Sequence, residues 1–149
     1  MNIYESVKYR LMSTDIMSKP ISWNYMMQFN MKNPPRTMIP RNPKVESEYK
    51  EHSRLLKSKG ISVHDYIMKT FLKDKNYNFA PNTFPYYLNH IQHWVLWIRP
   101  GLTISEKEIL DKIERNFNID SNELVIFKNK SNNQSIKSIT HYHIFIQDK

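Results

Sequence analysis

The 149-residue sequence contains no cysteine, only two glycines, and no apolar run that approaches the length of a membrane-spanning helix. The absence of cysteine excludes disulfides, cysteine-ligated zinc, iron–sulfur clusters and thiol nucleophiles. Two glycines are too few for a glycine-rich phosphate loop or a dinucleotide fingerprint, since both need close backbone approach without a Cβ. The first 15 residues lack the apolar stretch of a signal peptide, so we expect a soluble, cytoplasmic protein.

Positive charge is concentrated in the first part of the chain. The formal net charge is +8, and residues 1–60 hold 11 Lys and Arg against 5 Asp and Glu, whereas residues 61–149 hold 11 against 9. A basic segment favours association with polyanions but specifies no function. Lys and Asn are abundant throughout, as AT-rich coding also produces, so both readings of the charge stay open.

The first half of the chain reads as helical. Prolines at 34, 35, 40 and 43 interrupt it, because proline lacks the backbone donor that a helix needs. Gly60 is expected to end the helix that precedes it, and Ser62 to cap the helix that follows it. The predicted helices are Tyr4–Leu11, Trp23–Phe29, Val45–Lys59 and Val63–Leu72.

The second half shows the two-residue alternation of strands around one helix. Ser105 and Glu108 form a capping box before an amphipathic helix, and the predicted strands are Gln92–Ile98, Leu124–Lys128 and Ile139–Gln147. This order predicts an α+β fold with a small, mainly antiparallel sheet packed by helices. We expect a helical or extended basic segment over residues 1–43 and a single compact α+β domain over residues 44–149.

Alternation also separates polar from apolar side chains on two of the strands. If the apolar sets of both strands face the same helix, the opposite face gathers three imidazoles, an arginine and an indole. These are His93, Trp97, Arg99, His141 and His143. Such a face suits an anionic or aromatic ligand, although a His-x-His pair on a strand is as often ordinary packing, and tryptophans at this spacing are more often part of the core. The histidines match no metal-site spacing and have no carboxylate nearby, so we expect no metal and no cofactor.

The segment from Asn82 onward resembles the fungal N-acetylglucosamine-induced protein family, a domain of unknown function that also has members in large DNA viruses. The pattern that carries the resemblance is an N-x-FPY block, a His before an apolar-Trp strand, an Asn after a strand, and a Ser before a terminal H-x-H-x-F strand. It is matched by Asn82, Phe84-Pro85-Tyr86, His93, Trp97, Asn129, Ser138 and His141/His143/Phe145. This resemblance implies a fold and names no reaction.

A second likeness is to the histidine-triad nucleotide hydrolases and transferases, which also close on an alternating His strand. It implies that His143 is the nucleophile toward an α-phosphate and that His141 is its neighbour. Phe145 stands where a third histidine belongs, and it can neither hold a tautomer nor protonate a leaving group. We therefore expect binding rather than catalysis, with a histidine-dependent nucleotide hydrolase or transferase as the enzymatic alternative.

Two functional hypotheses follow. The first is a pocket for a nucleotide or another phosphorylated ligand, with binding residues Asn82, Phe84, Tyr86, His93, Trp97, Arg99 and Asn129 and catalytic candidates His143 and His141. The second is a module that binds RNA, including capped RNA, or a protein partner through the basic N-terminal third. Its candidate contacts are Trp23, Arg36, Arg41, Lys44 and Arg54, and its ordinary alternative is a solvated helix face.

Overall fold

The fold is built on one four-stranded antiparallel sheet. The computed structural model describes residues 19–130, 134 and 136–148, so the helix expected at Tyr4–Leu11 lies outside the described residues. The strands are ordered β1-β2-β4-β3 and comprise β1 (Tyr77–Pro81), β2 (Ile91–Ile98), β3 (Leu124–Phe127) and β4 (His141–Gln147). The two strands that carry the histidines are therefore central neighbours.

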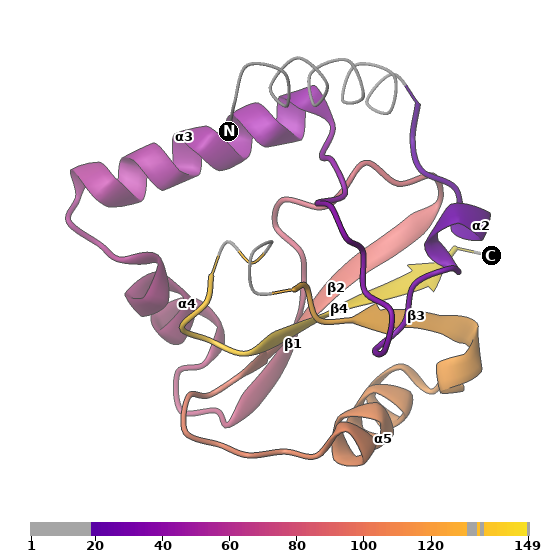
Figure 1. Ribbon diagram of the computed structural model, residues 1–149. Helices are drawn as coiled ribbons and strands as arrows, with labels where there is room; N and C mark the ends of the chain where they lie inside the picture. The colour runs from indigo at the N-terminus through magenta and orange to yellow at the C-terminus, as the bar shows by residue number, and fades with distance from the viewer. Residues whose placement is uncertain (1–18, 131–133, 135, 149) are drawn as a thin grey trace.

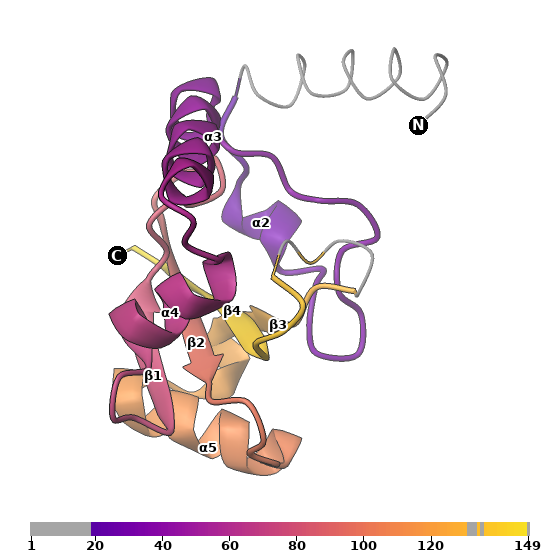
Figure 2. The ribbon, with the colours of Figure 1, turned by 90° about the vertical axis from the view of Figure 1, so that its left-hand side faces the viewer.

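Helices cover both faces of this sheet, as Figures 1 and 2 show. One face is covered by α5 (Glu106–Phe117), and a short 3₁₀ helix, η1 (Ser121–Glu123), leads from it into β3. The other face is covered by α2 (Trp23–Met26), α3 (Pro43–Ser58) and α4 (Val63–Phe71). The predicted α+β class is thus confirmed. No helix in the described part of the chain is long and apolar enough to cross a membrane.

The expected separation of the two sheet faces is observed. Leu96 lies opposite Tyr142 and Trp94 opposite Ile144, and these side chains pack with Ile109 of α5 in the main apolar cluster. Burial of this cluster follows from the helical spacing of apolar residues on α5 and the alternation on the strands.

The opposite face of the same strands carries the polar and aromatic side chains. Val95 pairs with His143, and Trp97 pairs with His141. Since side chains on paired positions of adjacent strands share a face, both histidines point toward α3 and α4. The register therefore decides which helices the histidines meet.

Local sequence signals set the C-terminal end of α3 and the start of α4, whereas α3 begins at Pro43, two residues before the predicted Val45. Gly60 adopts the left-handed φ of 69°, and its N–H and that of Ile61 bond the carbonyls of Lys57 and Leu56. Ser62 caps α4 by accepting the N–H of Asp65 at 3.0 Å. This short turn places α4 against the sheet beside α3.

Residues 19–43 contribute to the core on the α3 side. Ile21 forms a parallel bridge with Leu88, and Met26 and Ile39 are buried against Phe145. The helix in this segment ends at Met26, earlier than the predicted Phe29.

The strand β1 was not predicted. It pairs with β2 from Tyr77 opposite Ile98 to Pro81 opposite Trp94, at the edge of the sheet. Its sequence, YNFAP, is short, contains Asn and ends in proline, which an edge position tolerates because one side of the strand makes no ladder bonds.

The N-cap of α5 gives a stability prediction. Ser105 Oγ accepts the Glu108 N–H at 3.2 Å, so Ser105→Ala leaves this donor without its partner. We expect a loss of about 1 kcal/mol in the free energy of unfolding, measured by urea denaturation. Ser105→Asp is the matched control, because aspartate caps as well as serine does. An alanine variant as stable as the wild type would contradict the role of this cap.

Candidate functional site

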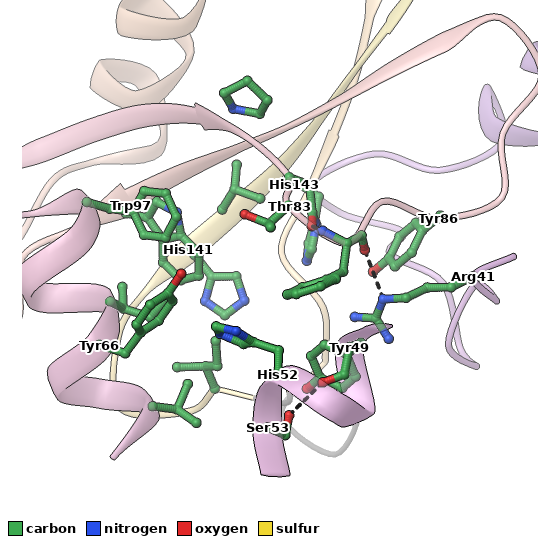
Figure 3. Close-up of a pocket in the computed structure, with 18 of the residues that line it drawn as sticks. Arg41, Tyr49, His52, Ser53, Tyr66, Thr83, Tyr86, Trp97, His141 and His143 are labelled. Atoms are coloured by element: carbon green, nitrogen blue, oxygen red, sulfur yellow. Dashed lines mark hydrogen bonds between the residues drawn. The ribbon is translucent and has the colours of Figure 1, made fainter. Parts of the chain in front are cut away.

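A cavity of about 100 Å³ lies between the polar face of the sheet and the helices α3 and α4 (Figure 3). Its floor is formed by β2 and β4, and its walls by the two helices and the loop that follows β1. Most of its lining is aromatic or apolar, with a few polar groups that converge on the interior. Such a composition is typical of a small-molecule site.

His141 presents one free nitrogen to this cavity. Its Nδ1 lies 2.8 Å from the carbonyl oxygen of Ile139, and a carbonyl can only accept, so Nδ1 carries the proton. The lone pair is therefore on Nε2. Within the described residues Nε2 has no hydrogen-bond partner, and His141 lines the cavity.

His93 and His143 form a buried pair behind this floor. The backbone N–H of Tyr86 donates to His93 Nδ1 at 3.2 Å, which leaves the His93 proton on Nε2. That nitrogen lies 2.8 Å from His143 Nδ1 and donates to it. Only 6% of His93 and 7% of His143 is exposed, so the pair is almost fully desolvated.

Both members of the pair are neutral at pH 7. Burial lowers the pKa of His93 well below its usual range, and the nearby His143 and Arg41 lower it further. Burial also lowers the pKa of His143, to about 3, with smaller contributions from His141 and Arg41. The pKa of His141 is lowered by burial too, although its bond to Ile139 counters part of this effect.

Asn129 and Tyr86 complete the chain of hydrogen bonds. The Asn129 amide nitrogen donates to Tyr86 Oη at 3.1 Å and lies 3.2 Å from His143 Nε2. His143 Nε2 therefore lies against the Asn129 side chain. Both ring nitrogens of His143 are thus engaged inside the protein, in contrast to His141.

The FPY block shapes the loop beside the cavity. Asn82 Oδ1 accepts the Phe84 N–H at 2.8 Å, and the Asn82 N–H donates to the His93 carbonyl. This Asx turn explains the asparagine two residues before Phe84. Asn82 therefore orients the loop, while the Phe84 ring forms part of the cavity wall.

Arg41 lies at one end of the cavity with its guanidinium fixed by three contacts. Nε donates to the Phe84 carbonyl at 2.9 Å, Nη1 pairs with Glu46 at 3.1 Å, and the guanidinium stacks 4.1 Å from the Tyr49 ring centroid. Its side chain is only 12% exposed. These contacts leave Nη2 without a partner among the described residues.

The helical wall was not predicted as part of the site. Figure 3 shows His52 and Tyr49 of α3 and Tyr66 of α4 directed into the cavity. The His52 ring packs against Tyr66 and Phe84, with centroids 4.8 and 5.2 Å apart. The available signal was the spacing of Tyr49 and His52, three residues apart on one helix face, which core packing also produces.

Most of the sequence-predicted ligand residues meet at the cavity. The lining includes Asn82, Phe84, Tyr86, Trp97, Asn129, His141 and His143. His93 supports His143 from behind. Arg99 lies elsewhere, because its guanidinium donates to the backbone carbonyls of Lys75 and Leu72, where it holds the turn before β1.

The residues of the nucleic-acid hypothesis do not gather in one place. Arg41 belongs to the cavity, and Trp23 is half-buried against the cluster of Phe127 and Phe145. Arg54 pairs with Glu51 on α3, a helix that carries both acidic and basic residues between Lys44 and Lys57. Arg36 is exposed on the segment before α3. No group of His, Asp or Glu among the described residues could hold a metal ion.

Comparison with known proteins identifies a family and a fold. A family model described as Protein of unknown function (DUF3605) matches residues 8–147, and no curated protein matches the sequence. A solved structure described as Crystal Structure of HTC1 is similar, with a TM-score of 0.53 and 18% identity over 74% of this chain and 77% of that chain. At this identity the likeness shows a shared fold alone.

Proposed function

The chain belongs to the DUF3605 family of proteins of unknown function, and we propose that its cavity binds a nucleotide or similarly phosphorylated small molecule. The observation that carries the proposal is the meeting of an aromatic cavity, an open imidazole nitrogen and a pre-ordered guanidinium within one site. The ring of the ligand occupies the cavity, and its phosphate binds at Arg41.

Aromatic side chains supply the surfaces on which a ring can stack. Tyr49, Tyr66 and Phe84 reach the cavity from three separate segments, and Trp97 forms part of the floor. Trp97 itself is stacked on Phe71, with centroids 5.5 Å apart and planes at 17°, so its position is fixed before any ligand arrives. Pre-ordered aromatic walls reduce the entropy lost on binding.

The size of the cavity limits what is enclosed. About 100 Å³ is below the ~300 Å³ at which pockets for whole drug-sized ligands begin, so it suits a ring rather than a complete nucleotide. The sugar and phosphate then lie toward Arg41. Its Nη2 is the donor left for a phosphate oxygen, since Nε and Nη1 already bond Phe84 and Glu46.

A catalytic variant of this proposal assigns the reactive nitrogen to His141. Nε2 of His141 carries a lone pair and faces the cavity, whereas both nitrogens of His143 are engaged with His93 and Asn129. Turnover of dinucleoside polyphosphates, sugar nucleotides or capped RNA that is lost in His141→Ala would support catalysis. If a ligand binds but is not turned over, the catalytic variant is wrong and the binding proposal stands.

Arg41 offers the direct test of nucleotide binding. Affinities of AMP, GMP, CMP and UMP, and of the matching nucleosides, are measured by calorimetry with the wild type and Arg41→Met. We expect at least one monophosphate to bind, and Arg41→Met to weaken it about tenfold while the nucleoside is unaffected, because one charge-assisted bond is lost.

Lys107→Met is the matched control, because Lys107 is an exposed cation on α5, across the sheet from the cavity. It changes the net charge by the same amount and should leave the affinity unchanged. The proposal is wrong if no monophosphate binds, or if both variants weaken binding equally, which would indicate diffuse electrostatic attraction.

A further inference from the structure

The polar groups of the cavity also specify which edge of a ring they can read. His141 Nε2 is an acceptor with no partner among the described residues, in a site where the two other sheet histidines are bonded to each other. Among the described residues no buried side-chain nitrogen or oxygen lacks a partner, so His141 Nε2 is reachable by water through the cavity, and a ring that fills the cavity displaces that water. Loss of that water without a replacement donor costs free energy. A ring that fills this cavity must therefore bring a donor to His141.

The charges of the side chains that line the cavity determine whether it accepts a neutral or a cationic ring. Among the described residues that line the cavity there is no Asp, Glu or Lys, and Arg41 is the single formally charged side chain. His141 and His143 remain uncharged at neutral pH, because burial lowers the pKa of both. A cationic ring would lose its hydration, gain no counter-charge and approach a guanidinium.

We infer that the cavity selects an uncharged nitrogen heterocycle whose N–H group donates to His141 Nε2, and that it rejects cationic rings such as 7-methylguanine. This inference rests on the proposed function and adds its ligand class. The absence of an acidic side chain distinguishes this cavity from an aromatic cage for a cationic base. Such a cage has similar stacking surfaces but also needs an acidic group to read the edge of the base.

Matched nucleotides test the donor with the wild-type protein. AMP is compared with purine riboside monophosphate and CMP with zebularine monophosphate, which lack the amino group of the parent base. UMP is compared with 3-methyluridine monophosphate, which lacks the ring N3–H. GMP is compared with 7-methyl-GMP, which adds a positive charge. Where a parent nucleotide binds, we expect its own analogue to bind at least tenfold more weakly.

The variant His141→Phe tests whether His141 Nε2 is the atom that distinguishes a parent nucleotide from its donor-free analogue. His141→Phe keeps a ring at the floor but removes the acceptor, so we expect it to bind a parent nucleotide and its donor-free analogue with equal affinity. A structural role alone would lower both affinities and keep their ratio. His90→Asn, at an exposed histidine outside the cavity, is the control and should keep the wild-type ratio.

The outcomes separate this inference from the proposed function. A donor-free analogue that binds as tightly as its parent, or 7-methyl-GMP that binds as tightly as GMP, overturns the inference while nucleotide binding stands. Absence of binding by every nucleotide overturns both. Because the analogue comparisons use the wild type, they hold even if His141→Phe fails to fold.

Discussion

Mild acid is expected to destabilise this protein well before its carboxylates titrate. The unfolded-state pKa of histidine is about 6.5, whereas burial lowers the pKa of folded His143 to about 3 and that of His93 in the same direction. Between these values the unfolded chain binds protons that the folded chain does not, so the free energy of unfolding falls as pH falls below 6.5. At pH 5 the loss is about 2 kcal/mol for each histidine that stays neutral in the fold.

Urea denaturation at pH 7.5, 6.5 and 5.0 measures this effect. The stability contribution should be fully present at pH 7.5 and should decline by about 2 kcal/mol at pH 5.0 from His143 alone, with a further loss in the same direction from His93. His90→Asn is the matched control, since His90 is exposed, and asparagine tolerates its positive φ of 54°. A wild-type stability that is constant from pH 7.5 to 5.0 would contradict the buried neutral pair.

The parts of the fold that depend on local pattern could be predicted from the sequence. Alternation along Gln92–Ile98 and Ile139–Gln147 placed Trp97, His141 and His143 on one face, and the caps at Ser62 and Ser105 fixed two helix starts. These signals are local because each concerns neighbours within one turn or one strand.

The strand register and the helical wall could not be obtained in this way. Whether His93 meets His143 depends on how β2 and β4 are aligned, and nothing within either strand specifies that alignment. His52 comes from a helix whose pattern fits simple core packing, and only its docking makes it part of a cavity. Arg99, one residue beyond β2, left the predicted face because the chain turns there and its guanidinium binds backbone carbonyls.

The structure also changes what the basic residues are expected to do. Arg41 was predicted as an RNA contact, yet it is the cation of the cavity, held by Phe84, Glu46 and Tyr49. RNA binding by the N-terminal segment stays a prediction. Its test is salt dependence, because phosphate contacts by several cations must weaken between low and physiological salt.

The hydrogen bond between His93 and His143 leads to the second large effect. His143→Phe leaves the His93 Nε2 proton without its acceptor, and His93→Phe leaves His143 Nδ1 without its donor. Because an unpaired buried polar group costs about 1–3 kcal/mol, each single variant should lose roughly 2–3 kcal/mol in the free energy of unfolding. The phenylalanine ring preserves the aromatic packing against Tyr86 and Phe145, so cavity formation adds little.

The double variant distinguishes a shared bond from two independent effects. With both imidazoles replaced, neither partner is orphaned, so the loss should be smaller than the sum of the single losses by about 1–2 kcal/mol. The Tyr86 N–H loses its acceptor in His93→Phe and in the double variant alike, so its cost cancels from the coupling energy. The double variant should also lose most of the acid sensitivity between pH 7.5 and 5.0, because no buried imidazole of the pair remains to resist protonation. Additive losses within about 0.5 kcal/mol, with the pH dependence retained, would show that the two rings are buried side by side without sharing a proton.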